Sequence, residues 1–356
     1  MNIKNINFLP TILSLIFTAL LIVIVLQMLV IQKKQSVNNN INAGEKPQEE
    51  VVINKEELVP QKERLIDGVL VGLDENETTL KAVMIENSIY ARPQSGIDKA
   101  NLVIEVPVEG GITRFLAIFD SSEDVIEIGP VRSARPYFLD WAKEYDSLYC
   151  HVGGSPEALK LIKNDNSFTN LDQYFKSEYY WRSSKRQRPH NVYTSTDLLN
   201  SAVERLDLGI SGFDSWKFKE DLDLDNRGVS NSEIFIDYSF KENEVKWIYN
   251  RENNDYIRYQ AREKHLTKDS EWIRSKNIII QKTKVLSIDS EDRKSITVVG
   301  SGDALLFLDG KTIEGSWKKE SQNKRTIFYN EVGEEVELNR GVTWIEVVSN
   351  KTYIEY

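Results

Sequence analysis

The pattern of apolar and polar positions separates an N-terminal membrane segment from a folded region. Residues 8–31 are apolar apart from four positions, and this length is enough to cross a bilayer as a helix. A secretory signal has a shorter apolar core and a small-residue cleavage site, whereas this run continues directly to Lys33 and Lys34. We therefore interpret 8–31 as an uncleaved transmembrane anchor behind a short segment, 1–7. A buried core helix is the alternative.

Residues 32–65 are rich in Asn, Gln, Glu and Lys and contain no aromatic side chain. Such a segment cannot bury enough apolar surface to fold, so it is predicted to be a disordered tether. About 290 residues follow, which is enough for two domains with cores of their own.

From residue 66 to 208, short apolar runs alternate with helical periodicity, which is typical of an α/β domain. Glu109-Gly110-Gly111 separates two apolar runs and predicts a hairpin. Three helices are predicted; Ser133 and Ser155 can cap the first two, and Thr194 or Ser195 can cap the third. The predicted strands are 82–85, 101–108, 112–119 and 146–152, and the predicted helices are 133–144, 155–163 and 195–206.

Residues 209–229 are dominated by polar residues and glycine, and we place a linker there. From 230 to 356, short apolar or alternating runs lie between turn residues and predict a β-rich domain. Its predicted strands are 233–240, 244–249, 255–260, 277–283, 295–299, 304–308, 312–317, 326–329 and 342–348. The expected fold class is an α/β domain with a mixed sheet and helices, followed by a β-rich domain, behind an N-terminal transmembrane helix.

Charge and cysteine content narrow the function classes. The first 34 residues contain three lysines and no acidic residue, so the remainder carries 42 basic and 55 acidic side chains. A region this acidic is a poor general binder of nucleic acid, and any anion site in it must be a local arginine pocket. Cys150 is the only cysteine, so neither a disulfide framework nor a multi-cysteine metal site is expected. No motif in the sequence indicates a cofactor.

The strongest candidate site lies between Glu109 and Ser155. Twice in this stretch an apolar run ends in Gly or Pro and a serine-led helix start follows, at Ser133 and at Ser155. Such turns present backbone N–H groups to an anion, and the planar fork of arginine suits carboxylate or phosphate. The predicted ligand-binding residues are Arg92, Arg114, Arg132, Ser133, Arg135, Gly153, Gly154, Ser155, Arg188 and Asn191. The alternative is a structural ion-pair network in which Glu105, Glu109 and Asp140 neutralise the arginines.

Two histidines are candidates for acid–base chemistry. His151 ends an apolar strand before Gly153, and His190 lies in a loop ahead of a helix. With Glu109 they form a candidate catalytic set near neutral pH, while the alternative is that both histidines donate to backbone carbonyls. A zinc site would need a third ligand such as Glu105 or Glu109, and no metal is assigned. Cys150 is interpreted as a buried small hydrophobe, and Ser133 and Ser155 as helix caps rather than nucleophiles.

Several motifs together carry a family resemblance. In the first half they are Tyr-Ala-Arg-Pro-Gln-Ser-Gly at 90–96, Glu-Gly-Gly-Ile-Thr-Arg at 109–114, Gly-Pro-Val-Arg-Ser-Ala-Arg-Pro at 129–136, His-Val-Gly-Gly-Ser-Pro at 151–156 and Arg-Pro-His-Asn at 188–191. In the second half they are Val-Gly-Ser-Gly at 299–302, Gly-Ser-Trp-Lys-Lys at 315–319 and Gly-Val-Thr-Trp at 341–344. The chain resembles the YerB-like family, cell-envelope proteins of Gram-positive bacteria with a domain of unknown function and a C-terminal companion domain.

The resemblance spans about residues 68–350. It implies a membrane-held, extracytoplasmic protein and no established activity. Many relatives look like lipoproteins with a lipid-bearing cysteine after the signal peptide, but here no cysteine lies near residue 31, so the transmembrane segment is expected to anchor the protein. Relatives also tend to carry Gly-x-x-His-x-Asp where this chain has His265 and Asp269 in a different setting, and the role of this pair stays open.

Two main functional hypotheses follow. We favour a binding module, held in the cell membrane by a single pass with its folded domains outside the cytoplasm. It would capture an anionic envelope ligand, or an acidic segment of a partner protein, in an arginine-lined pocket. The alternative is an enzyme that acts on a cell-wall glycan or its precursor through His151, His190 and Glu109. In a third possibility the β-rich half recruits another protein.

Overall fold

The structure, a computed structural model, describes residues 24–29, 32, 60–75, 78–120 and 124–356. It contains two units, Met1–Leu58 and Val59–Tyr356. In the first unit the described residues are helical and exposed. The rest of the predicted anchor, and most of the predicted tether, lie outside the described residues. Over the part of the chain that is described, no helix has the length and apolar character needed to span a membrane.

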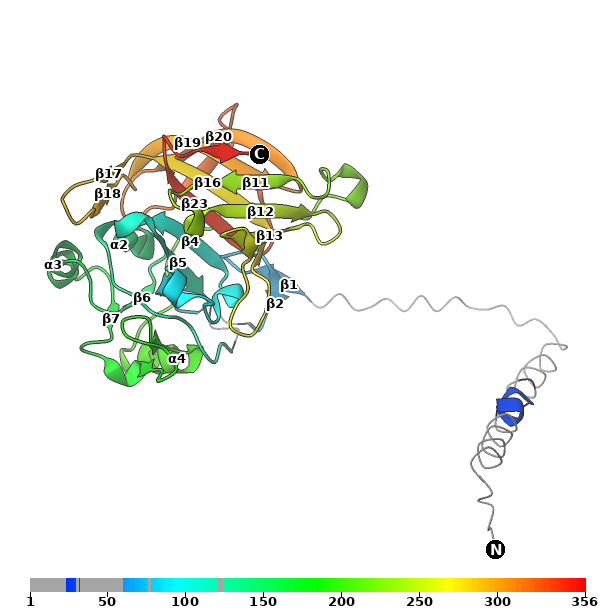
Figure 1. Cartoon of the computed structure of the whole chain (residues 1–356), viewed down its shortest axis with the longest axis horizontal. Coiled ribbons are helices and arrows are strands. Elements are labelled where there is room, and N and C mark those ends of the chain that lie inside the picture. The colour runs from blue at the N-terminus through cyan, green and yellow to red at the C-terminus, as the bar shows by residue number, and fades with distance from the viewer. Residues whose placement is uncertain (1–23, 30–31, 33–59, 76–77, 121–123) are drawn as a thin grey trace, which may run out of the picture. The chain divides into compact units, whose positions relative to one another are not determined.

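A ten-stranded mixed sheet forms the centre of the second unit (Figure 1). Its strands, in spatial order, are β21 (Ile327–Asn330), β20 (Lys311–Lys319), β19 (Gly300–Leu308), β16 (Asn277–Thr283), β23 (Thr343–Ser349), β4 (Leu102–Pro107), β5 (Thr113–Phe119), β3 (Lys81–Glu86), β6 (Leu148–His151) and β7 (Asn170–Asp172). The N-terminal and C-terminal regions meet where β4 runs parallel to β23. The predicted mixed sheet is confirmed, and it is continuous between residues 66–208 and 230–356.

The central strands are buried on both faces of this sheet. Every residue of β3 and of β5 is buried. Side chains alternate along a strand, so Val83 and Ile85 join one hydrophobic core while Ala82 and Met84 join the other. A strand covered on both faces has a continuous apolar run rather than an alternating one, which explains the pattern at 82–85.

Three α-helices are found among the described residues of the second unit: α2 (Pro136–Glu144), α3 (Pro156–Asn164) and α4 (Thr196–Arg205). Two of the predicted caps are confirmed, because the side chains of Ser155 and Ser195 accept hydrogen bonds from the N–H groups of Ala158 and Leu198. The prediction that a helix begins at Ser133 is wrong. Helix α2 begins at Pro136, whose fixed φ suits a first helical position, and its cap residue is Arg135.

A second, antiparallel sheet packs on the first. Its strands are β14 (Glu263–Lys264), β13 (Asp255–Gln260), β12 (Val245–Asn250), β11 (Glu233–Ile236) and β24 (Ile354–Glu355), and β15 (Arg274–Ser275) also pairs with β13. Burial alternates along β12, where Val245, Trp247 and Tyr249 face inward. The Trp247 ring meets the Trp344 ring of β23 edge-on, with centroids 5.2 Å apart. This sheet therefore covers one face of the ten-stranded sheet.

The segment 209–229, predicted as a linker, is packed into the fold. The Ser211 hydroxyl donates to the carbonyl of Asp146 at 2.7 Å, and the Trp216 indole donates to the carbonyl of Thr326 at 2.8 Å. Residues 61–63, at the end of the predicted tether, form the short strand β1. The remaining strand pairs are β1 (Gln61–Glu63) with β2 (Leu70–Gly72), β8 (Trp181–Arg182) with β9 (Val192–Tyr193), β10 (Phe218–Lys219) with β22 (Leu338–Asn339), and β17 (Val285–Ser287) with β18 (Lys294–Ile296).

Candidate functional site

Glu86 is the carboxylate on which two of the predicted arginines meet. It ends β3 and is 1% exposed. Its Oε2 accepts from Arg132 Nε at 2.6 Å and from Arg114 Nη2 at 3.3 Å, while its Oε1 accepts from the backbone N–H groups of Asn87 and Ser88. Burial by itself raises the pKa of this carboxyl, but Arg114 and Arg132 outweigh burial and lower the pKa to about 2.

Backbone pairing brings this cluster together. The antiparallel register of β3 and β5 places Arg114 directly opposite Glu86. The loop that carries Arg132 runs beside the end of β3, because the Arg132 N–H donates to the carbonyl of Met84 at 2.9 Å. Sheet register and this loop, rather than a helix N-terminus, position the two guanidinium groups.

Arg135 has its own carboxylate. Its Nε and Nη2 donate to the two oxygens of Glu109 at 2.5 and 2.9 Å, and its Nη1 donates to the carbonyl of Ala134. Burial lowers the pKa of Arg114, and the guanidinium groups of Arg135 and Arg132 lower it further while Glu86 opposes them. Arg132 and Arg135 therefore both lie near enough to Arg114 to repel it. Arg135 fits the ion-pair alternative, because Glu109 neutralises it.

Arg92 is held at the same corner of the fold without a carboxylate. It donates to the side chain and the carbonyl of Asn87 at 3.2 and 2.8 Å, and to the carbonyl of Glu242 at 2.7 Å. Burial, followed by repulsion from Arg258, lowers the pKa of Arg92 to about 10. Arg92 thus links the N-terminal region to the turn that follows β11.

A further arginine, Arg186, was missed from the sequence. Its Nη groups donate to the carbonyls of Tyr90, Arg92 and Pro93, which ties its loop to the corner around Asn87. Arg188, which was predicted, is exposed, and among the described residues its side chain has neither an ion-pair nor a hydrogen-bond partner. Arg114 and Arg132 thus contact Glu86, Arg92 contacts Asn87, and Arg186 contacts the backbone of residues 90–93 beside them. We call this group the Glu86 corner.

The two serine-led segments lie side by side, as the N–H of Ala134 donates to the carbonyl of Gly153 and Ala134 forms a bridge with Gly154. The N–H groups of Gly153 and Ser155 are already bonded, to the Asp172 carboxylate and to the carbonyl of Ala134 respectively. These N–H groups are thus used by the fold and not presented to an anion.

Ser133 and Asn191 also serve the local structure. The Ser133 carbonyl accepts from Arg114 Nη1 at 3.0 Å. The Asn191 side chain accepts from Arg182 at 3.1 Å and donates to the carbonyl of Ser183 at 3.3 Å. Both residues thus support the loops that surround the arginines.

The two histidines occupy different environments. His151 is fully buried, with Nδ1 2.8 Å from the carbonyl of Gly153 and Nε2 3.3 Å from Asn170 Oδ1, and burial lowers its pKa. His190 is partly exposed, and its ring centroid is 6.1 Å from that of Tyr90. Burial lowers the pKa of His190, and the Glu86 carboxylate opposes this shift. His190 thus belongs to the Glu86 corner, whereas both ring nitrogens of His151 are engaged inside the fold.

A buried polar network, also missed from the sequence, continues from Asn87 into the C-terminal half. The Gln94 side chain donates to Asn87 at 3.0 Å, and its oxygen lies 2.8 Å from Nε2 of His265. His265 contacts Arg258, whose Nη2 donates to Glu105 at 2.5 Å. The role of His265, open from the sequence, is at least to join the two regions through this network. Arg258 also lies over three aromatic rings, those of Phe115, Trp247 and Trp344.

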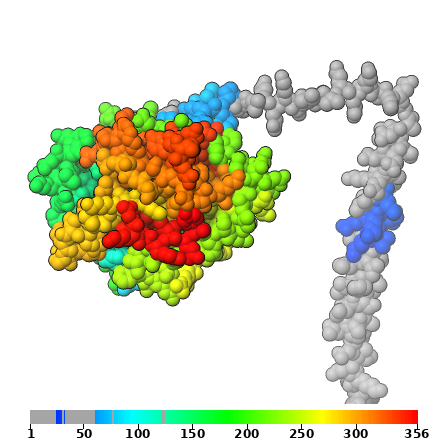
Figure 2. All heavy atoms as spheres, turned by 90° about the horizontal axis from the view of Figure 1, so that it is seen from above, coloured from blue at the N-terminus to red at the C-terminus, as the bar shows by residue number. Residues whose placement is uncertain are grey.

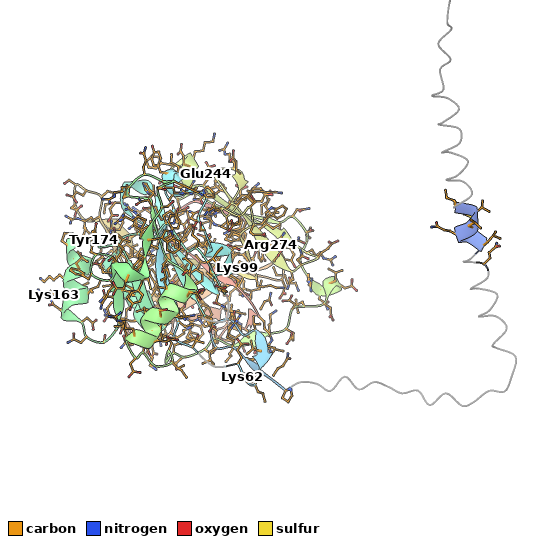
Figure 3. The ribbon with its side chains drawn as sticks, turned by 90° about the horizontal axis from the view of Figure 1, so that it is seen from below. Lys62, Lys99, Lys163, Tyr174, Glu244 and Arg274 are labelled. Atoms are coloured by element: carbon orange, nitrogen blue, oxygen red, sulfur yellow. The ribbon has the colours of Figure 1, made fainter. Side chains whose placement is uncertain are left out.

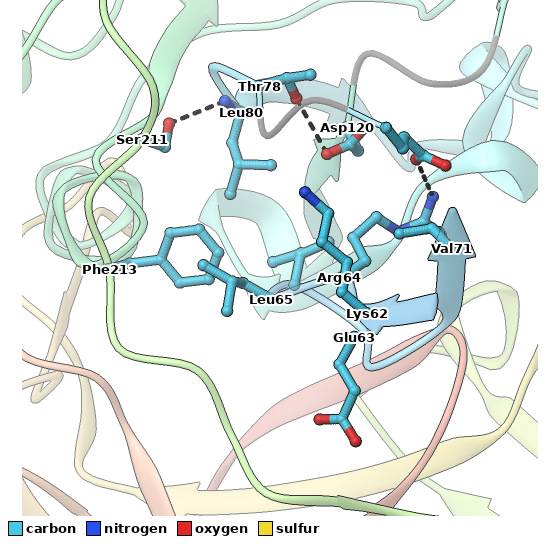
Figure 4. Close-up of a pocket in the computed structure, with 12 residues that line it drawn as sticks. Lys62, Glu63, Arg64, Leu65, Val71, Thr78, Leu80, Asp120, Ser211 and Phe213 are labelled. Carbon is cyan, nitrogen blue, oxygen red and sulfur yellow. Dashed lines mark hydrogen bonds and ion pairs between the residues drawn. The ribbon is translucent and has the colours of Figure 1, made fainter. Parts of the chain in front are cut away.

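Two cavities in the described parts of the second unit are lined by residues other than the predicted arginines. A space of about 30 Å³ lies between Arg64, Leu80, Asp120 and Phe213, beside the hydrogen bonds of Thr78 to Asp120 and of Leu80 to Ser211 (Figure 4). A groove of about 510 Å³ follows β11 and β12 and reaches the C-terminal residues, drawn in red in Figure 2. The arginine corner is instead a partly open surface, with the side chain of Arg132 20% exposed. Within the described residues, no three His, Cys, Asp or Glu side chains gather where a metal could bind.

Fold and network together define a mixed-sheet protein in which two sequence regions share one sheet and one buried polar cluster. Residues 69–209 match the family described as "Protein of unknown function (DUF3048) N-terminal domain", and residues 234–345 match its C-terminal domain. The chain belongs to this DUF3048 family.

Relatives support this membership. The chain is 32% identical over 316 residues to "Putative lipoprotein YerB" of Bacillus subtilis (strain 168), which covers 84% of this chain and 91% of the relative. The crystal structure of YerB protein from Bacillus subtilis has a TM-score of 0.73 at 29% identity and covers 83% of this chain and 100% of that one. The resemblance that the motifs indicated is confirmed.

Proposed function

We propose that this protein is a membrane-anchored, extracytoplasmic binding protein that captures an anionic envelope ligand, or an acidic segment of a partner protein, at the Glu86 corner. One observation carries the proposal: in a chain whose formal net charge is −10, the guanidinium groups of Arg114 and Arg132 share the carboxylate of Glu86, and those of Arg92 and Arg186 bond to neutral groups beside it. A local positive excess on an acidic body attracts anions selectively and disfavours extended polyanions such as nucleic acid.

The anchoring role is assigned to residues 8–31. The relative carries the name "Putative lipoprotein YerB", and the lipid anchor of a lipoprotein needs a cysteine near the membrane. The one cysteine of this sequence, Cys150, is buried in β6. The apolar run at 8–31 therefore takes the place of the lipid, with the second unit on the extracytoplasmic side.

The enzyme alternative receives less support. It requires His151, His190 and Glu109 to act on one substrate. His151 is fully buried with both ring nitrogens engaged, and Glu109 accepts two hydrogen bonds from Arg135. Binding needs none of these groups to be free, which favours the binding function.

Thermal unfolding of the full chain in detergent tests the proposal. The anions are citrate, pyrophosphate and an acidic peptide, and the variants are Arg132→Ala and Arg274→Ala. Arg274, labelled in Figure 3, is a suitable control because it pairs with Asp255 on β13 and, among the described residues, contacts neither Glu86 nor Asn87. We expect at least one anion to raise the melting temperature of the parent and of Arg274→Ala but not that of Arg132→Ala. Equal shifts in all three proteins, or no shift with any anion, would contradict the proposal.

A further inference from the structure

The charge at the Glu86 corner is not balanced within the corner. Arg114 and Arg132 share one carboxylate, Glu86. All described hydrogen-bond partners of Arg92 are neutral, and the Nη groups of Arg186 donate to backbone carbonyls. Among the described residues, Glu86 is the one carboxylate within ion-pair distance of these four guanidinium groups, and it contacts two of them. An anion with two charges therefore complements the corner better than an anion with one.

Three buried polar atoms without partners in the described part of the chain lie on residues of the same corner. Ser88 is 8% exposed, its N–H faces Glu86, and its hydroxyl has no hydrogen-bond partner among the described residues. Among the described residues, Nε of Arg114 and Nδ1 of His190 are also buried without a hydrogen-bond partner. Buried polar atoms rarely stay unpaired, and a ligand with several acceptor oxygens would satisfy these three.

Arg132 supplies the accessible part of this donor set. Its Nε is bonded to Glu86, whereas its two Nη groups have no partner among the residues that the structure describes. They form one edge of a guanidinium fork, the geometry that binds two oxygens of a phosphate or a carboxylate. The other donors approach from separate chain segments, at Ser88, Arg114 and His190. A tetrahedral group with three terminal oxygens can meet donors from several directions, whereas a planar carboxylate offers two oxygens in one plane.

A ring platform adjoins the donors. Tyr90 is 73% exposed, and its ring lies 6.1 Å from that of His190. An exposed aromatic ring beside a charged site can pack against a ring carried by the ligand.

We propose that the Glu86 corner binds the dianionic phosphate group of a phosphate monoester, and that Tyr90 contacts the sugar ring that carries the phosphate. This inference rests on the proposed function and gives it a ligand class. Arg132 and Arg92 provide charge, Ser88 and His190 provide hydrogen bonds, and Tyr90 distinguishes a phosphorylated sugar from free phosphate. No bond is made or broken.

Isothermal titration of the full chain in detergent tests this ligand class. The probes are glucose 1-phosphate, inorganic phosphate, glucose and citrate at pH 7.5, where a phosphate monoester is mainly dianionic. We expect glucose 1-phosphate to bind more tightly than inorganic phosphate, and glucose to give no binding. Tyr90→Ala should bring glucose 1-phosphate to the level of inorganic phosphate. Arg132→Ala and Ser88→Ala should each weaken both phosphates about tenfold or more, and Arg274→Ala should weaken neither.

The outcomes separate this inference from the proposed function. Citrate binding as tightly as glucose 1-phosphate, with the same loss in Arg132→Ala, would overturn the phosphate assignment and leave the anion site standing. Absence of binding by every anion would overturn both. Unchanged phosphate affinity in a folded Ser88→Ala and a folded Arg132→Ala would overturn the placement at this corner. Circular dichroism melting of each variant establishes that it is folded.

Discussion

Glu105 and Glu346 stand directly opposite each other on the parallel strands β4 and β23, and both are fully buried. Arg258 pairs with Glu105, while the two oxygens of Glu346 accept hydrogen bonds from the Trp247 indole and the Tyr238 hydroxyl at 2.8 Å each. The junction between the two sequence regions is thus built around two acidic side chains and one guanidinium group. Burial first, and then the neighbouring Glu105, raise the pKa of Glu346 well above its usual value.

The first prediction concerns Glu346. Because its pKa is higher in the folded than in the unfolded state, its stabilising contribution is complete below about pH 4.5 and is lost as the pH rises through the folded pKa. Glu346→Gln mimics the neutral acid, so we expect it to exceed the parent in stability by roughly 1–3 kcal/mol at pH 8. The gain should shrink toward pH 5. Urea unfolding at both pH values measures it, with Glu291→Gln on an exposed turn as the control. A variant less stable than the parent at pH 8 would contradict the raised pKa.

The second prediction concerns Glu86, whose pKa is shifted in the opposite direction. The ionised Glu86 carboxylate contributes its full share to the stability of the fold above about pH 4.5, and this contribution is lost as the pH falls toward about 2. Glu86→Gln is expected to cost roughly 3 kcal/mol at pH 7 and to flatten the loss of stability between pH 4.5 and 2. Stability measured against pH in both proteins checks this. An acid transition of unchanged steepness in the variant would argue against Glu86 as its origin.

The third prediction concerns the buried pair that joins the halves. Arg258→Ala leaves Glu105 buried without its guanidinium and empties the space under three aromatic rings. Loss of one partner of a buried ion pair costs about 3–5 kcal/mol. Chemical denaturation measures this cost. Arg262→Ala, which removes an exposed pair with Glu244, is the control and should unfold close to the parent. Similar stability of the two variants would show that the buried pair does not hold the halves together.

The fourth prediction compares two serines. Ser155→Ala removes the side chain that caps α3 and should cost about 1 kcal/mol, whereas Ser133→Ala should cost less because the cap residue of α2 is Arg135. Thermal unfolding of both variants ranks them. The reverse order would mean that Ser133 supports the fold through its hydroxyl.

The fifth prediction uses two adjacent glycines of the turn between β4 and β5. Both have positive φ, but a Cβ on Gly111 would lie 2.4 Å from the Phe240 ring, whereas a Cβ on Gly110 meets no described atom within 4 Å. Gly110→Ala should cost about 1 kcal/mol from backbone strain alone, and Gly111→Ala should cost more. Denaturant midpoints of the two variants measure the difference. Equal midpoints would show that Phe240 moves aside freely.

Local features of this fold could be predicted from the sequence. The apolar run at 82–85, the glycine turn at 109–111 and the caps at Ser155 and Ser195 each depend on a few neighbouring residues, and each is present in the structure. The start of α2 was misplaced because Ser133 and Pro136 both signal a helix start, and the structure follows Pro136.

Long-range pairing could not be predicted in the same way. Glu105 and Arg258 are 153 residues apart, and they meet because β4 pairs with β23 and the second sheet packs over that junction. The motifs identified the arginines but not their partner. Glu86 ends a buried strand, and only the register of β3 with β5 shows that Arg114 lies opposite it.

Direct titration of pyrophosphate into the parent, Arg132→Ala and Arg274→Ala tests the anion site at Glu86 most directly. Saturable binding by the parent and Arg274→Ala, with affinity at least about tenfold lower in Arg132→Ala, is the expected result. Equal affinity in the two variants, or no saturable heat in the parent, would contradict it.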